Sequence, residues 1–182
     1  MVNSNQKVID ILNQKYGLDK EEKDLKDYDF RSIYQDITIE EKLGILESDD
    51  FFDNLEFKEG CLETLKILAR YYDIVIVSIG TEENLRKKEC FLTANMPVAF
   101  DFIGIDKGKE DIDMRDGIQI DDCLFNLDTN ANIKVLLKSE YLFPWQSHYE
   151  NSDILVVYNW EQIRDVLMFY NDYNYYTLEL KK

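Results

Sequence analysis

Length, composition and charge already limit what the chain can be. Its 182 residues, 45% of them apolar and 13% aromatic, are enough for one substantial hydrophobic core. Its 37 acidic and 21 basic residues give a formal net charge of -16, which repels phosphate backbones and anionic lipid. We therefore expect neither nucleic acid nor a membrane surface as a partner.

The cysteines and the single histidine predict a reduced, cytoplasmic protein. Cys61, Cys90 and Cys123 are an odd number and show no CxxC or Cys/His spacing. His148 is the only histidine, which argues against a histidine-rich metal site or a Ser/His/Asp triad. We expect His148 to be a surface residue, with a Cys/His or Ser/His pair as the open alternative. From the first residues we expect neither a signal peptide nor a membrane anchor.

The first 50 residues have helical patterns. Apolar residues recur at helical spacing over residues 5–16, and Gly17 offers a stop. Thr38 precedes Glu41 in the spacing of a capping box and predicts a second helix. We therefore expect residues 1–50 to form a small helical, cap-like segment.

Residues 51–182 have the alternating pattern of an α/β core. A helical stretch with apolar residues at 62, 65, 68 and 69 leads into an unbroken β-branched run at 73–79, which is typical of a parallel strand covered on both faces. Further strands are expected at residues 99–105, 117–120, 133–137 and 154–157, and further helices at 81–95, 124–130 and 160–170. This alternation predicts a doubly wound parallel sheet.

Polar side chains follow three of the expected strands, where ligands of open α/β sheets collect. Ser78 ends the first strand, Lys107 and Lys109 follow the second, and Asp121 and Asp122 end the third. A hydroxyl, an ammonium and a carboxylate pair can together hold a phosphate and Mg²⁺, which prefers oxygen ligands. Alternatively, Ser78 caps the next helix, the lysines belong to a solvated loop, and the carboxylate pair is held by other donors.

The order of these groups resembles a known family. The segments VIVSIGT and KEDIDMRDGIQIDD are similar to the second, third and fourth motifs of haloacid dehalogenase-like phosphatases, in the 5'(3')-deoxyribonucleotidase and cytosolic type C 5'-nucleotidase branch. FFDNLEFKEGCLETLKIL and YNWEQIRDVL resemble the first core helix and the final helix of that branch. The resemblance covers nearly the whole chain and implies its Rossmann-like sheet with a helical cap.

The resemblance also implies roles for individual residues. Ser78 would bind the phosphate of a nucleoside or deoxynucleoside monophosphate, and Lys109 would be a catalytic residue that steadies that phosphate and the nucleophile. Asp121 and Asp122 would hold Mg²⁺, with Asp121 as the direct ligand. In the family an aspartate after the first strand attacks the phosphate, and a second aspartate protonates the leaving alcohol.

The sequence departs from the family at its start. No strand and no DxDx motif ending in Thr or Val precedes Ser4, and Asp111-Ile-Asp113 lies in a charged loop, where we interpret it as a chance match. Without that central first strand, two strand edges would be exposed. The chain is then a fragment, or pairs those edges by self-association or with another chain, or has a rebuilt noncatalytic sheet.

Two functions remain open at this stage. One is a 5'-nucleotidase-type phosphatase, impaired without the nucleophile, in which Phe30, Tyr34, Phe51 or Phe52 stacks on a base or packs in the core. The other is a noncatalytic relative that binds phosphate or a partner. A receiver-type signalling domain is disfavoured because its acidic pair precedes its lysine, the reverse of the order here.

Overall fold

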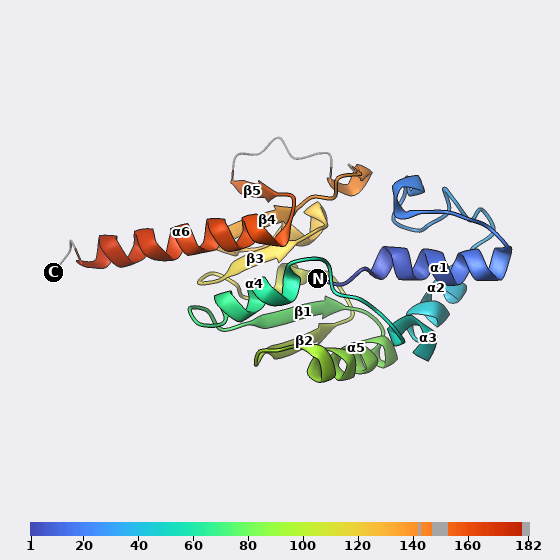
Figure 1. The fold of residues 1–182 in the computed structure, drawn as a ribbon, viewed down its shortest axis with the longest axis horizontal. Coiled ribbons are helices and arrows are strands. Elements are labelled where there is room, and N and C mark those ends of the chain that lie inside the picture. The colour runs from blue at the N-terminus through green and yellow to red at the C-terminus, as the bar shows by residue number, and fades with distance from the viewer. Residues whose placement is uncertain (142, 147–152, 180–182) are drawn as a thin grey trace.

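The computed structural model describes residues 1–141, 143–146 and 153–179, with side chains described as far as Asn171. His148 lies outside the described residues. The chain is a mixed α/β protein with parallel strands, as the sequence predicts. A helical region of residues 1–55 lies at one end of the α/β region, and the final helix extends away from the other end (Figure 1).

The helical region contains three α-helices, and the first two have the stop and cap signals that the sequence predicts. They are α1 (Ser4–Tyr16), α2 (Ile39–Leu46) and α3 (Asp49–Phe52). Gly17 ends α1 in the left-handed conformation, with φ of 66°, which glycine adopts without strain. The Thr38 and Ser48 hydroxyls accept hydrogen bonds from the backbone N–H groups of Glu41 and Phe51, so both helices start with a capped end.

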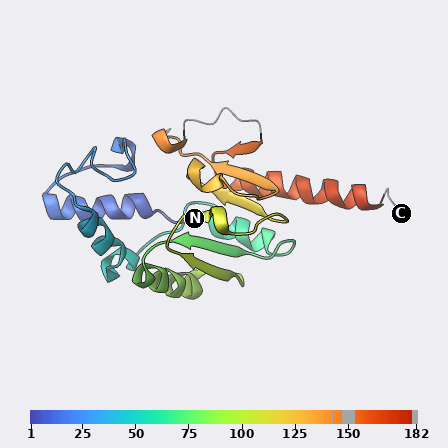
Figure 2. The same cartoon turned by 180° about the vertical axis from the view of Figure 1, so that it is seen from behind.

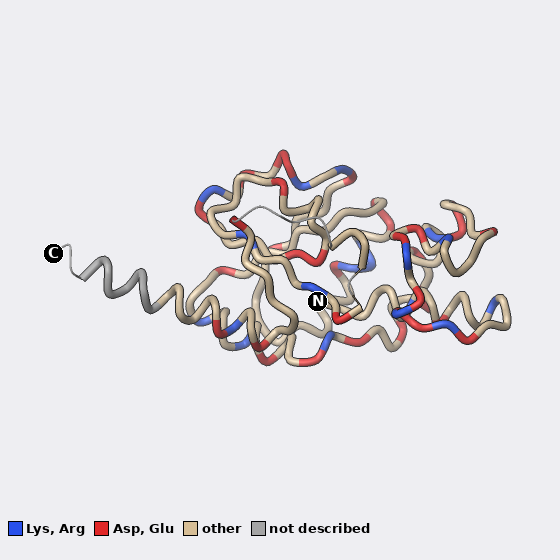
Figure 3. Tube along the Cα trace, turned by 90° about the horizontal axis from the view of Figure 1, so that it is seen from above, with Lys and Arg blue, Asp and Glu red and all other residues tan. Residues whose placement is uncertain are grey.

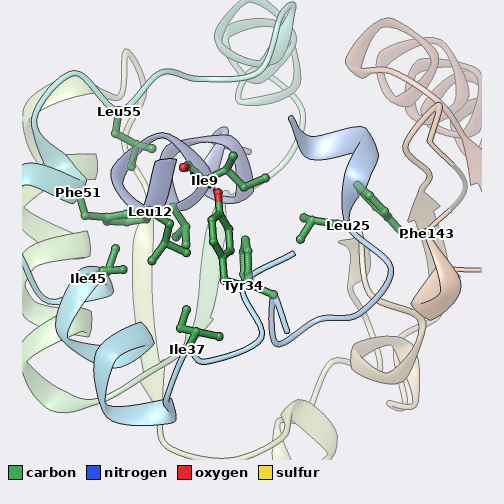
Figure 4. Packing of buried hydrophobic residues seen from close by; sticks show 11 residues of the cluster. Ile9, Leu12, Leu25, Tyr34, Ile37, Ile45, Phe51, Leu55 and Phe143 are labelled. Carbon is green, nitrogen blue, oxygen red and sulfur yellow. Dashed lines mark hydrogen bonds between the residues drawn. The ribbon is translucent and has the colours of Figure 1, made fainter. Parts of the chain in front are cut away.

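These helices close around a core of their own. Ile9 and Leu12 of α1 are fully buried, and side chains from α2, α3 and the connection between α1 and α2 surround them (Figure 4). The Tyr34 hydroxyl has a hydrogen-bond acceptor within this core, the Ile9 carbonyl at 3.2 Å. The buried members of this cluster are Val8, Ile9, Leu12, Leu25, Phe30, Tyr34, Ile37, Ile45, Phe51, Leu55 and Phe143.

The α/β region contains five strands, all in parallel pairs, but they form two sheets. One sheet is β1 (Val75–Ile79) beside β2 (Asp101–Ile105), and the other is β3 (Ile118–Asp121), β4 (Ile133–Leu137) and β5 (Ile154–Val157) in that order. The helices of this region are α4 (Cys61–Leu68), α5 (Glu82–Asn95) and α6 (Trp160–Glu179). β1 and β3 lie on facing sides of a gap, next to which the N-terminus lies (Figures 1 and 2).

Most predicted elements are present with shifted ends. Residues 124–130 form only the short 3-10 turn Leu124–Leu127, and α6 continues to Glu179 where the sequence predicts an end near residue 170. The other 3-10 turns are Glu22–Asp24, Lys109–Asp111 and Pro144–Gln146. The described strands form two sheets, whereas the sequence predicts one doubly wound sheet, because β1 and β3 do not pair with each other.

Two helices cover the sheets and provide the second core. Cys61, Leu65 and Leu68 of α4 and Trp160, Ile163 and Leu167 of α6 pack with Val135, Leu137 and Val157 of the larger sheet. The Thr64 hydroxyl donates to the Trp160 carbonyl at 3.0 Å, which joins the two helices. On the smaller sheet, α5 lies so close to β2 that a Cβ at Gly104 would come within 3.0 Å of Leu85.

Polar contacts attach the helical region to the start of α5. The Asn84 side chain donates to the Leu46 carbonyl at 2.5 Å, the Thr81 hydroxyl bonds Glu47, and Lys87 pairs with Asp49 at 2.5 Å. The helical region is thereby placed beside the carboxyl end of β1. Acidic residues are spread along both regions (Figure 3). Within the described ranges, no helix has the length and apolar character needed to cross a membrane.

Candidate functional site

A large cleft separates the two sheets. It has a volume of about 1450 Å³ and is lined on one side by Val75 to Ser78 of β1 and on the other by Ile118 to Asp121 of β3. Leu65, Leu68 and Trp160 contribute from α4 and α6. At the carboxyl ends of β1 and β3 the lining becomes polar, and there it includes Ser78, Lys88, Lys109, Asp121 and Asp122. The structure therefore brings all the predicted site residues to one end of one cleft.

Ser78 is held by a lysine that the sequence analysis did not identify. The Lys88 ammonium, two turns into α5, donates to the Ser78 hydroxyl at 2.6 Å. Burial and, to a lesser degree, repulsion by the Lys109 ammonium lower the pKa of Lys88 to about 8. Across the described chain, no carboxylate forms a salt bridge with Lys88. Lys88 is therefore a half-buried cation that has only a hydroxyl as its hydrogen-bond partner among the described residues.

Lys109 and Asp121 form the best-buried ion pair among the described residues. Lys109 Nζ lies 2.6 Å from Asp121 Oδ2, and their side chains are only 12% and 6% exposed. The other carboxylate oxygen of Asp121 accepts from the Cys123 backbone N–H at 2.9 Å and from the Asn126 amide at 3.0 Å. Asp121 is thus compensated by one ammonium and two neutral donors.

Asp122 is exposed and lines the cleft beside Asp121. Among the described residues, no group of three or more His, Cys, Asp or Glu side chains could hold a metal ion. Two carboxylates suffice for Mg²⁺ when waters and phosphate oxygens complete its six ligands. Lys109 Nζ contacts Asp121 Oδ2, so an ion bound there would have to displace this contact.

The structure distinguishes between the alternative roles that the sequence leaves open for single residues. Thr81, and not Ser78, caps α5, because its hydroxyl accepts from the Asn84 backbone N–H at 3.3 Å. Lys107 is exposed, as expected of a solvated loop, whereas Lys109 is not. Asp113 pairs with Arg115 at 2.6 Å and precedes β3, so it lies before that strand and not at its carboxyl end.

The aromatic residues considered for base stacking lie mainly in the core. Phe30, Tyr34 and Phe51 are at most 4% exposed and belong to the helical core. Phe52 lines the cleft and packs between Phe51 and Phe91, with ring centroids 5.0 and 6.1 Å away. The packing alternative therefore describes the first three.

Lys88 could have been found from the spacing of α5. Asn84 and Leu92 are buried, and each lies four residues from Lys88 along α5. Lys88 therefore lies on the buried face of the helix. A charged residue on such a face needs a polar partner, and the partner is Ser78.

Comparison with known proteins adds no family assignment. No protein-family model matches the chain, and no curated protein matches it significantly.

Proposed function

We propose that the polar end of the cleft binds a phosphate monoester and that the chain is a relative of the haloacid dehalogenase-like 5'-nucleotidases. The observation that carries the proposal is the convergence of Ser78, Lys88 and Lys109 at the carboxyl ends of two parallel strands. Ammonium groups make short, charge-assisted hydrogen bonds to phosphate oxygens. The proposed ligand class is a nucleoside or deoxynucleoside monophosphate, as the sequence resemblance implies.

Each donor has capacity left for a phosphate. The Ser78 hydroxyl accepts from Lys88 and keeps its own hydrogen to donate. The Lys109 ammonium has three hydrogens, of which one is directed at Asp121. A phosphate in this position would also raise the lowered pKa of Lys88, because it supplies the opposite charge that the lysine lacks.

Asp121 and Asp122 would hold Mg²⁺ in this proposal. Bound Mg²⁺ would offset negative charge on the phosphate oxygens. The carboxylate of Asp122 is exposed and lines the cleft, which supports this role. Asp121 would exchange Lys109 for the cation, which leaves the ammonium free to turn to the phosphate.

The hydrolysis that the resemblance implies needs an aspartate nucleophile, and the described residues do not place one at this end of the cleft besides Asp121 and Asp122. The other aspartates that line the cleft, Asp73, Asp113 and Asp116, precede β1 or β3 in the sequence instead of following a strand. We therefore expect phosphate binding to exceed hydrolytic activity in this chain. The same observation favours the second candidate function, a phosphate-binding relative without catalysis.

Calorimetric titration with inorganic phosphate and with nucleoside monophosphates, with and without Mg²⁺, tests the binding proposal. Lys88→Met should weaken phosphate binding about tenfold or more, since a hydrogen bond to a charged group contributes about 1.5–3 kcal/mol. Lys107→Met removes the same charge at an exposed position and should leave the affinity unchanged. Equal affinities of Lys88→Met and the unmodified chain would contradict the proposal.

Phosphate release separates the two candidate functions. Mg²⁺-dependent release from a monophosphate that Asp121→Asn abolishes would establish a phosphatase. Binding without release would establish the noncatalytic relative. Neither binding nor release by the folded chain would reject both.

A further inference from the structure

Ser78 and Lys88 form a hydroxyl–amine pair at the polar end of the cleft. Lys88 Nζ lies 2.6 Å from Ser78 Oγ, and both side chains line the cleft. Ser78 belongs to β1 and Lys88 to α5, so the pair joins two elements. A general base takes the proton of a hydroxyl nucleophile across a distance of about 2.6–3.2 Å. The pair therefore has the geometry of a nucleophile and its base.

The turn between β1 and α5 sets this geometry. Only Gly80 and Thr81 separate the strand from the helix, so Ser78 stands just before a tight strand-to-helix turn. A Cβ at Gly80 would lie 2.6 Å from Asn84 Oδ1, so the turn needs a residue without a side chain at this position. The helix that follows brings Lys88 back to the hydroxyl.

Lys88 can be neutral at mildly alkaline pH. Burial and, to a lesser degree, the Lys109 ammonium lower its pKa to about 8. The groups that face Lys88 from other elements are the Ser78 hydroxyl and the Lys109 ammonium. Asp121 and Asp122 line the same end of the cleft, and Asp121 is paired with Lys109. A neutral amine accepts a hydroxyl hydrogen, whereas an ammonium group only donates.

Positive charge at this end of the cleft can stabilise the oxyanion that forms when a hydroxyl attacks a carbonyl group. Lys109 lines this end, and one of its three ammonium hydrogens is directed at Asp121, which leaves two. The 14-residue helix α5 starts four residues after Ser78 and adds the positive end of its dipole. Fixed positive charge where negative charge develops is a large part of catalysis in acyl transfer.

The lining near the pair suits an apolar acyl group. Phe91 lies three residues after Lys88 in α5, and its ring centroid is 6.1 Å from that of Phe52. Both phenylalanines line the cleft, as does Val77, which precedes Ser78. A small aliphatic acyl group would therefore contact apolar side chains while its carbonyl carbon lies at Ser78 Oγ.

We propose that Ser78 and Lys88 are a catalytic dyad that hydrolyses carboxylic esters of small apolar acids, with Ser78 as the nucleophile and Lys88 as the general base. Lys88 Nζ takes the proton of Ser78 Oγ as this oxygen bonds to the ester carbonyl carbon. The bond from that carbon to the alcohol oxygen then breaks, and the alcohol leaves with the proton from Lys88. Water repeats these steps on the acyl-serine, which releases the acid and restores the hydroxyl.

The inference goes beyond the proposed function, because it needs neither a phosphate nor a metal ion. The two chemistries also use different protonation states of Lys88. Phosphate binding uses the ammonium form, and ester hydrolysis uses the neutral amine.

Covalent labelling tests the nucleophile on the unmodified chain. An alkyl fluorophosphonate bonds through phosphorus to an activated serine oxygen and releases fluoride, and peptide mass spectrometry locates the label. We expect label on Ser78 at pH 9. Ser48 and Ser139, whose hydroxyls bond main-chain groups and not a lysine, should remain unlabelled. A folded chain without label on Ser78 would overturn the inference.

Hydrolysis of p-nitrophenyl butyrate tests the base. Lys88→Met should lower the rate about a hundredfold or more, the usual contribution of a general base. Lys88→Arg should lower it similarly, because a guanidinium group keeps the charge and the donor but does not give up its proton. Lys107→Met removes a charge at an exposed position and should keep the rate. Full activity of Lys88→Arg would assign Lys88 a structural role and overturn the dyad.

The pH profile separates a base from a structural contact. After subtraction of the rate of Ser78→Ala, the rate should rise about tenfold per pH unit below the pKa of Lys88 and level off above about pH 8. A flat profile, or a rate that Ser78→Ala retains, would overturn the inference. Calorimetric titration of the same sample with inorganic phosphate reports separately on the proposed function, so either can fail alone.

Discussion

The helical region and the split sheet differ in how fully they bury their apolar side chains. In the helical region, three helices with local stop and cap signals close around fully buried Ile9 and Leu12. In the α/β region, the apolar strand β1 remains half exposed, and two strand edges face a cleft of about 1450 Å³. A helix satisfies its own backbone, whereas a strand depends on neighbours. The comparison shows that a chain can complete one core and leave another open.

The largest effect should come from the closed core. Leu12→Ala removes a fully buried side chain and should lower the free energy of unfolding by about 3 kcal/mol, through lost burial and a residual cavity. Denaturant unfolding measures this change. Leu18→Ala, at a residue that is 42% exposed, is the matched control and should cost less than about 1 kcal/mol. Similar losses for both variants would contradict a closed helical core.

The next effect concerns the ion pair at the open cleft. Lys109→Met leaves the carboxylate of Asp121 buried with only the Cys123 N–H and the Asn126 amide as donors, and should cost about 2 kcal/mol of unfolding free energy. Lys107→Met should change stability by less than about 0.5 kcal/mol. Adding Asp121→Asn should recover part of the loss. A double variant less stable than Lys109→Met alone would argue against this pairing.

Helix capping should contribute less than either. Thr38→Ala removes the hydroxyl that accepts from the Glu41 N–H and should cost about 1 kcal/mol. Thr93→Ala makes the same substitution at an exposed position within α5 and should be neutral or slightly stabilising. Thermal unfolding distinguishes the two. A neutral Thr38→Ala would mean that α2 is held by packing alone.

A pH dependence, which is a test of another kind, reports on Lys88, which has no carboxylate partner among the described residues. Its pKa is about 8 in the folded chain against 10.5 as the ordinary value, so between these pH values the unfolded chain binds a proton that the folded chain has released. The free energy of unfolding should therefore rise with pH across this window, relative to Lys88→Met. Below pH 8 the free energy of unfolding should change with pH in the same way for both proteins. Parallel pH profiles of the unfolding free energy for the two proteins would show that the pKa of Lys88 is not lowered in the folded chain.

Phosphate binding should respond to the same titration in the opposite direction. As pH rises through about 8, unliganded Lys88 loses the charge that attracts the phosphate, and affinity should fall. Lys88→Met should lack this component. Calorimetric titration at pH 7 and pH 9 gives the comparison.

Local chemistry allowed much of the fold to be predicted. Gly17 and Thr38 limit helices through contacts within a few residues, and the unbroken run that becomes β1 has the pattern of a covered parallel strand. The sequence also identified Ser78, Lys109, Asp121 and Asp122, because polar residues directly after apolar strands must meet at one edge of a parallel sheet.

The sequence by itself determined the α/β class and placed Ser78, Lys109, Asp121 and Asp122 after apolar strands, but it did not identify Lys88. Only the tertiary structure decided that Lys88 bonds Ser78, that Lys109 rather than Lys107 is paired with Asp121, and that the Trp160 donor has no acceptor among the described residues. These contacts join residues from different elements, so they depend on how helices pack on sheets and not on any local pattern. The gap between β1 and β3 also depends on tertiary structure and not on a local pattern, since strand pairing is set by the neighbours that are present.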